Sequence, residues 1–320
     1  MECPGLSASR PAGAGNTPPV TYPDYMLTRR SLIAASAALP SPAAAGGAMY
    51  LAMHQTTSAG SSFRASLEGY ARAGIRYVEV IPPLVEEFVK RESAAAAKRL
   101  MADLGLKAVS SGGVRGLAEP NPGRSQALEQ LKHTAALAAE LGIDRLVCPC
   151  GTTEKFTSDD YARGVDNLRE AGEIVRAVGV TAMLEFMRGS TFIGTLPTSL
   201  KVTRQLSHPH VRPMLDCYHF WAGLSKFEDL DMLHDGEVHH VHFQDVPDIP
   251  REQLDNGTRE IPGEGVSPLV RILRKLAEKD YRGPLSVELF YPRLQQGDPY
   301  EVALQIRRAA EPILRQAGVM

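Results

Sequence analysis

The stretch VRPMLDCYHF, residues 211–220, begins as an apolar run and ends in polar side chains. Its apolar part is typical of a strand that is buried on both faces. The stretch then delivers a carboxylate, Asp216, and three residues later an imidazole, His219. Because a buried polar group costs free energy unless it has a partner, a strand that ends in this way points to a binding site.

Similar apolar runs recur along the chain and alternate with amphipathic segments. The expected strands cover residues 49–54, 76–81, 106–110, 145–150, 181–186, 211–216, 238–244 and 285–290. The expected helices cover residues 62–73, 85–104, 125–141, 158–178, 198–206, 229–233, 266–279 and 299–317. Such alternation predicts an α/β protein with a single (β/α)8 TIM barrel. An open doubly wound sheet is the alternative, but no glycine-rich phosphate turn follows the first strand.

The residues before the barrel are expected to form a disordered or cleaved segment. Residues 1–25 are rich in Pro, Gly and Ser, which indicates disorder or a misassigned start. Residues 26–47 carry Arg29 and Arg30 before a short Ala-rich run, a pattern typical of a twin-arginine export signal. The run is too short and too rich in proline to span a membrane in the mature protein. We therefore expect a periplasmic barrel over residues 48–320, with a cytoplasmic protein as the alternative.

The net charge argues against a nucleic-acid partner, and the cysteine content argues against a disulfide-stabilised fold. The net charge of −2 gives no basic surface for nucleic acid. Four cysteines in 320 residues do not make a disulfide framework. Cys148 and Cys150 share one face of a predicted strand, and we expect both to be core residues.

The carboxyl ends of the strands in a parallel barrel meet at one mouth, where catalytic groups lie. Four expected strands carry a metal-ligand type of side chain near this end: Glu185, Asp216, His242 and Glu288. Carboxylates and imidazole together suit Mn²⁺, Mg²⁺, Co²⁺ or Zn²⁺ better than a thiol-preferring ion. These four strand ends therefore predict a metal site.

The order Glu, Asp-x-x-His, His-x-His, Glu resembles the xylose-isomerase-like TIM-barrel superfamily, which includes sugar phosphate isomerases and epimerases and the AP endonuclease family 2. The resemblance covers residues 48–316 and is most specific in DCYHFWAG, HVHFQD, IPGEG and GPLSVELF. It implies that Glu185, Asp216, His242 and Glu288 bind one divalent metal ion, with Mn²⁺ expected. It also implies that Glu185 and Glu288 carry protons and that His219 contacts a substrate hydroxyl.

The DNA-repair branch of this superfamily does not fit the sequence. A chain that resembled endonuclease IV would have further histidines after the third and fourth strands, and Asp-Arg-His before Gly-x-Gly. Here no histidine lies between His54 and His133, and Gly257, Thr258 and Arg259 stand before the glycines. We therefore expect a mononuclear site and no nucleic-acid partner.

The resemblance implies chemistry on a small polyhydroxylated carbonyl compound. The expected function is a metal-dependent isomerase or epimerase of a ketose, inosose or keto-glycoside that acts through an enediolate. A dehydratase of a cyclic keto-polyol, such as inosose or 3-dehydroshikimate, is the alternative, and a non-catalytic sugar-binding barrel is a third. Ketose epimerases have a second Glu six residues after the first, where this chain has Thr191. The expected partner is a keto-sugar or keto-polyol, and barrels of this type also form homodimers.

Further residues are expected to contact substrate beside His219. His54 and Glu79 lie at the ends of the first two strands, with a structural histidine and a buried pair as the alternatives. Arg188 is expected to meet a substrate oxygen or carboxylate, with a helix acid as the alternative partner. Arg251 is expected to neutralise an anionic substrate, with an exposed loop arginine as the alternative. Trp221 is expected to form a wall for a sugar ring, or else to pack in the core.

Overall fold

The computed structural model describes residues 49–320. The predictions for residues 1–25 and for the export signal at residues 26–47 fall outside the described residues. Within residues 49–320, no helix is both long enough and apolar enough to cross a membrane.

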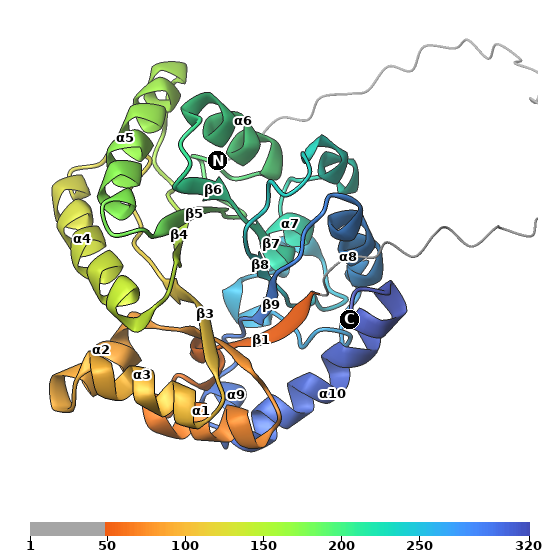
Figure 1. Ribbon diagram of the computed structural model, residues 1–320. Helices are drawn as coiled ribbons and strands as arrows, with labels where there is room; N and C mark the ends of the chain where they lie inside the picture. The colour runs from red at the N-terminus through yellow and green to blue at the C-terminus, as the bar shows by residue number, and fades with distance from the viewer. Residues whose placement is uncertain (1–48) are drawn as a thin grey trace, which may run out of the picture. The chain divides into compact units, whose positions relative to one another are not determined.

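The strands form one parallel sheet that winds into a nearly closed barrel (Figure 1). Their bounds are β1 (Tyr50–His54), β2 (Tyr77–Val80), β3 (Lys107–Gly112), β4 (Arg145–Cys150), β5 (Thr181–Phe186), β6 (Val211–Pro213), β7 (Leu215–Asp216), β8 (Val241–His242) and β9 (Pro284–Val287). The strand order is β6-β5-β4-β3-β2-β1-β9-β8-β7. Because β1 pairs with both β2 and β9, the first and last strands are neighbours, and the predicted barrel is confirmed.

The sixth expected strand, residues 211–216, is divided into β6 and β7. β6 pairs with β5 and β7 pairs with β8, while Met214 lies between them. Pro213 has no N–H group to continue a ladder. The Met214 N–H still reaches the Leu184 carbonyl at 3.2 Å, and the Leu215 N–H reaches the His240 carbonyl at 3.1 Å. The continuous segment of residues 211–216 thus pairs first with β5 and then with β8, which nearly closes the barrel.

Helices surround the sheet on its outer side (Figure 1). Their bounds are α1 (Phe63–Arg72), α2 (Pro82–Arg91), α3 (Ala94–Asp103), α4 (Arg124–Leu141), α5 (Ser158–Arg176), α6 (Leu196–Leu206), α7 (Cys217–Ala222), α8 (Leu269–Glu278), α9 (Pro292–Gln295) and α10 (Pro299–Ala317). α10 packs against both α1 and α8 and so completes the outer layer.

Two expected helices differ from the prediction, and two short helices, α7 and α9, were not expected. The helix expected over residues 85–104 is two helices, because the Ser93 hydroxyl accepts the Ala96 N–H and begins α3. The segment expected at residues 229–233 is a 3₁₀ helix, Phe227–Met232. The short helix α7 follows β7 directly, because the Asp216 side chain accepts the His219 N–H.

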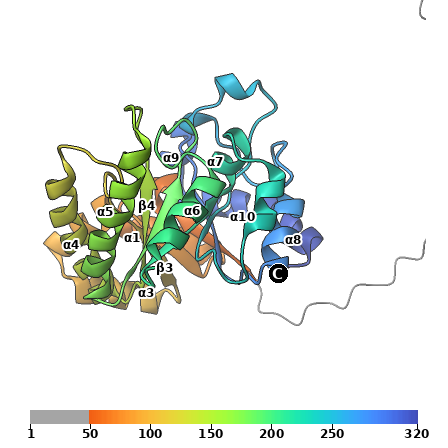
Figure 2. The ribbon, with the colours of Figure 1, turned by 90° about the horizontal axis from the view of Figure 1, so that it is seen from above.

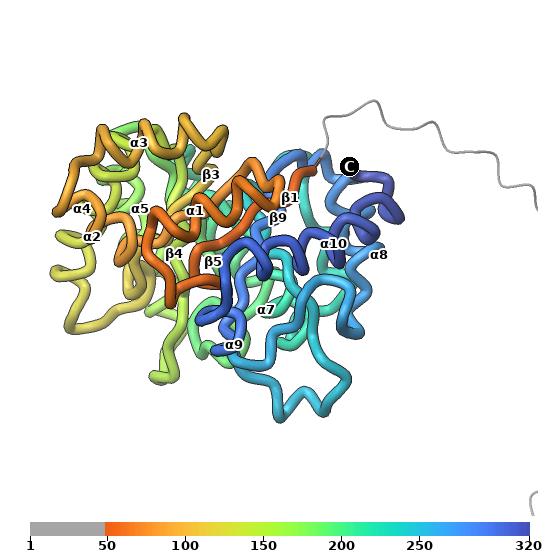
Figure 3. Tube along the Cα trace, turned by 90° about the horizontal axis from the view of Figure 1, so that it is seen from below, coloured from red at the N-terminus to blue at the C-terminus, as the bar shows by residue number. Residues whose placement is uncertain are grey.

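The strands have apolar outer faces and a largely polar interior near the mouth. Outward side chains such as Val78, Leu184 and Val287 pack with the helices in the main core. The interior cluster is small and contains Val147, Met183 and Met214. α7, α9 and the segment after β8 extend from the same end of the barrel (Figures 2 and 3). Because these segments follow strands, this end is the carboxyl-end mouth.

Asp245 organises the long segment after β8. Its Oδ1 accepts the N–H groups of Val246 and Ser267 at 2.9 and 2.8 Å. Its Oδ2 accepts those of Gly263 and Gly265 at 3.1 and 3.2 Å. The Asp245 backbone also bridges Glu260, so the chain from residue 246 to 259 is closed into a loop over the mouth.

We predict that Asp245→Ala lowers the free energy of unfolding by about 2–4 kcal/mol, because it leaves one buried and three partly buried N–H groups without their acceptor. Urea unfolding followed by circular dichroism measures this loss. Asp248→Ala, at an exposed position of the same loop, is the matched control and should leave the urea midpoint unchanged. Equal midpoints for Asp245→Ala and the unaltered protein would contradict the prediction.

Candidate metal centre

The structure brings the four predicted ligands together at the mouth. Glu185 lies near the end of β5, Asp216 ends β7, His242 ends β8, and Glu288 follows β9 by one residue. One ligand atom from each lies within 4.8 Å of those from the others. Glu185, Asp216 and His242 are buried, and the Glu288 side chain is 13% exposed. Residues distant in the sequence thus form one compact polar cluster.

One nitrogen of His242 faces the three carboxylates. Its Nδ1 lies 3.0 Å from Glu185 Oε1, 3.4 Å from Asp216 Oδ2 and 3.4 Å from Glu288 Oε2. Three carboxylates and one imidazole nitrogen around a common centre are a donor set that divalent Mn, Mg, Co and Zn accept. The side chains therefore fit a divalent metal ion.

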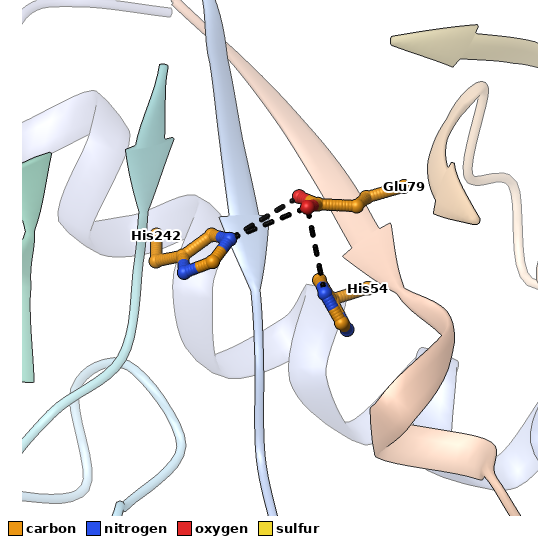
Figure 4. Close-up of side chains that lie close together, drawn as sticks. All are labelled: His54, Glu79 and His242. Atoms are coloured by element: carbon orange, nitrogen blue, oxygen red, sulfur yellow. Dashed lines mark hydrogen bonds and ion pairs between the residues drawn. The ribbon is translucent and has the colours of Figure 1, made fainter. Parts of the chain in front are cut away.

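The other nitrogen of His242 faces Glu79, a fourth buried carboxylate (Figure 4). Glu79 Oε2 lies 3.3 Å from His242 Nε2 and 2.8 Å from His240 Nε2, and its Oε1 lies 3.4 Å from His54 Nε2. Glu79 has no exposed surface. Of the two interpretations of Glu79 from the sequence, this geometry favours the buried pair. His54 is also buried, and its Nε2 lies 3.7 Å from Glu288 Oε1.

Arg259 lies against the cluster, which the sequence did not predict. Its Nη1 lies 3.1 Å from Asp216 Oδ2 and 2.5 Å from Glu288 Oε2. Its guanidinium carbon lies 5.0 Å from the centroid of the Tyr218 ring and 4.9 Å from that of the Phe290 ring. Arg259 belongs to an irregular loop, where periodicity gives no information on direction. The only available signal was a charged residue shortly before IPGEG.

His219 lies beside Arg259 with one nitrogen already bound. The Arg188 N–H donates to its Nδ1 at 3.3 Å, so the hydrogen of the neutral ring lies on Nε2. Arg259 Nη2 lies 3.1 Å from this Nε2. Burial, together with the charge of Arg259, lowers the pKa of His219 to about 4, so the ring is neutral near pH 7. Two N–H donors that lie this close together favour a shared oxygen acceptor beside them.

The three carboxylates of the cluster differ in their charge environment. Burial raises the pKa of Glu185, which Arg259 does not contact. Burial has the same tendency at Asp216 and Glu288, but Arg259 and the neighbouring histidines together outweigh it and lower both pKa values. Asp216 Oδ2 also accepts a hydrogen bond of 2.7 Å from Gln244. Arg259 therefore favours the ionised forms of Asp216 and Glu288 but does not contact Glu185.

The remaining predicted substrate contacts lie at the rim. The Arg188 guanidinium donates to the backbone carbonyls of Ala222, Leu254 and Arg251 and so ties the loop to α7. The exposed Arg251 places its guanidinium carbon 5.0 Å from the centroid of the Trp221 ring. Substrate contact by these side chains stays a prediction.

Two other positions are used structurally. Thr191, which replaces the second glutamate of ketose epimerases, donates to the carbonyls of Thr152 and Glu154. Cys148 and Cys150 are buried in the core between the strands and the helices. Neither position contributes a carboxylate to the mouth.

The chain belongs to the xylose isomerase-like TIM barrel family, whose model matches residues 67–311. It is similar to the inosose isomerase of Halalkalibacterium halodurans, with 30% identity over 177 residues, which are 54% of this chain and 63% of that protein. It is also similar to the 3-dehydroshikimate dehydratase of Pseudomonas putida, with 27% identity over 241 residues, which are 73% of this chain and 37% of that protein. The chain thus spans less than two thirds of the length of either relative.

Solved structures share the fold. The IolI protein with a bound zinc atom superposes with a TM-score of 0.80 at 22% identity, over 85% of this chain and 100% of that chain. The structure of L-ribulose 3-epimerase gives a TM-score of 0.68 at 19% identity, over 84% of this chain and 95% of that chain. At this identity the likeness concerns the barrel itself.

Binding of a divalent ion should release a proton. Burial alone would lower the pKa of His242, but the charges of Glu79, Glu288 and Glu185 raise it well above its usual value. In the metal-free protein His242 is therefore an imidazolium near pH 7, with hydrogen on both ring nitrogens. A metal ion must displace the proton on Nδ1. Metal affinity should rise with pH, with about one proton released per ion.

Calorimetric titration with Mn²⁺ in two buffers of different ionisation enthalpy, repeated at several pH values, measures this release. A binding heat that is independent of the buffer, together with an affinity that does not change with pH, would contradict the prediction.

Proposed function

We propose that this protein is a divalent-metal-dependent isomerase or epimerase of a small polyhydroxylated carbonyl compound, acting through an enediolate. The observation that carries the proposal is the convergence of Glu185 and Glu288 with Asp216 and His242, with ligand atoms within 4.8 Å of one another. Residues of these types at the carboxyl ends of barrel strands are the usual composition of an active site. Mn²⁺ is the ion that we propose, since a set rich in carboxylate oxygen suits it.

A bound divalent ion would polarise the substrate carbonyl and make the adjacent C–H more acidic. The ligands would be Glu185, Asp216, Glu288 and Nδ1 of His242. Glu185 lies on β5 and Glu288 directly follows β9, and these strands are not neighbours in the sheet, so the two glutamates approach the centre from different sides. Each has a carboxylate oxygen that can accept a proton from a substrate carbon or return one to it. Two such groups are what an epimerisation needs.

The neighbouring side chains would orient the substrate and stabilise its developing charge. His219 Nε2–H and Arg259 Nη2–H converge on one region beside the cluster. A substrate oxygen placed there accepts both hydrogen bonds. Donors aimed at an oxygen that gains negative charge lower the activation barrier to enolate formation. The burial of both side chains strengthens these interactions, because water is excluded.

A specific observation supports a second candidate, a dehydratase of a cyclic keto acid. The Arg259 side chain is only 2% exposed, and its Nε has no hydrogen-bond partner among the described residues. A buried guanidinium with an unused donor matches the planar geometry of a carboxylate. Relatives named 3-dehydroshikimate dehydratase are consistent with this alternative. Both candidates begin with enolisation and differ in whether water leaves.

We predict that Glu185→Gln and Glu288→Gln each lower enolisation by at least about 100-fold, because each removes a proton carrier. The measurement is deuterium uptake by a panel of keto-sugars, inososes and dehydroshikimate in D₂O with the Mn²⁺-loaded protein. Glu154→Gln, at an exposed position, is the control and should retain the full rate. Unchanged exchange in both variants, or no exchange with any compound by the unaltered protein, would contradict the proposal.

Arg259→Lys tests the carboxylate-binding role of this residue. Lysine keeps the charge but loses the planar pair of donors. If the substrate is a keto acid, kcat/KM should fall by about 10- to 100-fold for that acid, the effect of losing charge-assisted hydrogen bonds. Product mass identifies the reaction, since loss of water means dehydration. An unchanged kcat/KM for the keto acid in Arg259→Lys would contradict the carboxylate-binding role of this residue.

A further inference from the structure

Glu79 is a buried acid that the chemistry above does not use. It lies on β2, has no exposed surface, and faces three imidazoles, those of His54, His240 and His242. Figure 4 shows His54 and His242 directed at its carboxylate from two sides. A carboxylate buried so completely requires donors to offset the loss of water. These imidazoles are its ion-pair partners among residues 49–320, and neither Lys nor Arg takes part.

The second nitrogens of these rings show where their hydrogens lie. His54 Nδ1 accepts the Thr56 N–H at 3.1 Å, so its own N–H is on Nε2, toward Glu79. His242 Nδ1 faces Glu185, Asp216 and Glu288, and its Nε2 lies between 3.3 and 3.4 Å from the two oxygens of Glu79. With an N–H held at Nε2, loss of the Nδ1 proton would leave the Nδ1 lone pair of His242 directed at the centre of the other three carboxylates.

The position of Glu79 excludes a direct part in catalysis. Its carboxylate lies on the far side of the His242 ring from Glu185 and Asp216, and the rings of His54, His240 and His242 cover it. A substrate at the mouth has no access to a side chain with no exposed surface. An effect of Glu79 on the centre must therefore pass through the imidazoles.

We propose that Glu79 is the positioning residue of the metal centre: it fixes the tautomer and the ring orientation of His242, so that Nδ1 is presented to the ion. This inference rests on the proposed metal site. A carboxylate that accepts the second N–H of a ligand histidine orients the ring and increases the basicity of the ligating nitrogen. Glu79 also binds His54, whose Nε2 lies 3.7 Å from Glu288 Oε1, so it supports the centre from β1 as well as from β8.

The same residues offer a different arrangement, which the experiment must separate. His54, Glu79 and His242 carry ligand-type atoms within 4.8 Å of one another and could coordinate a second ion. In that case His242 would bridge two ions through both nitrogens, and neither nitrogen would carry hydrogen. Metal stoichiometry and the protonation of His242 therefore distinguish the two arrangements.

The test compares the unaltered protein with Glu79→Gln and Glu79→Asp. Glu119→Gln is the matched control, because Glu119 is also a buried glutamate and lies in the loop after β3. Each protein is titrated with Mn²⁺ and, separately, with Co²⁺, whose visible absorption reports the geometry of its ligands. The protonation of the His242 nitrogens is read from ¹⁵N chemical shifts of the Zn²⁺-loaded unaltered protein. Far-ultraviolet circular dichroism confirms that each variant is folded.

We expect one ion per chain, a protonated Nε2 on metal-bound His242, and metal affinity that is about 10- to 100-fold weaker in Glu79→Gln, with an altered Co²⁺ spectrum. Glu79→Asp should lose less affinity, since it retains the charge, and Glu119→Gln should behave as the unaltered protein. A proton on Nδ1 of His242 in the Zn²⁺-loaded protein would overturn the inference even if no Glu79 variant folds.

Three other results would also overturn it, and each has a distinct meaning. Retained affinity and an unchanged spectrum in folded Glu79→Gln would leave the proposed function intact but remove the positioning role. Two ions per chain, one of them lost in Glu79→Gln, would identify a second metal site instead. If the unaltered protein binds no divalent ion, the proposed function fails and the inference fails with it.

Discussion

The arrangement of the mouth depends on one imidazole that lies between buried carboxylates. His242 faces Glu185, Asp216 and Glu288 with Nδ1, and Glu79 with Nε2. Four carboxylates so close together repel one another strongly in a low-dielectric interior. The barrel offsets this repulsion with positive charge and hydrogen-bond donors, above all with Arg259 and with the histidines around Glu79. A divalent ion at the same centre would supply further compensation.

Much of this arrangement was visible in the sequence because it follows strand periodicity. Glu185, Asp216 and Glu288 each interrupt an apolar run, and the ends of parallel strands converge, so their meeting could be predicted. Alternation along HVH also places His240 and His242 on the same interior face. Which of the two histidines faces the other strand ends came from the family resemblance, since periodicity does not give the depth of a side chain along the barrel axis.

The sequence did not predict the features that depend on segments without regular periodicity. Arg259 reaches the cluster from a loop whose path is set by the backbone bridge between Asp245 and Glu260. No periodic pattern specifies such a path. α7 is a short helix that exists because Asp216 caps it, so the residue proposed as a ligand through one oxygen also shapes the chain through the other. The division of the sixth strand at Met214 likewise follows from a change of neighbour that only the closed ring imposes.

The loop over the mouth and the interior of the barrel contribute different features to the site. Side chains on the strands form the charged centre, whereas Arg259, Trp221 and the segment tied by Arg188 shape the space above it. Barrels of this kind commonly keep a centre on their strands and vary substrate through their loops. At this centre we propose that Glu185, Asp216, Glu288 and Nδ1 of His242 bind one divalent ion.

An anomalous difference map from crystals grown with Mn²⁺ tests that claim most directly. We predict a single strong peak within about 2.0–2.4 Å of one oxygen from each carboxylate and of His242 Nδ1. No peak at these four side chains, or a peak bound by a different set of residues, would contradict it.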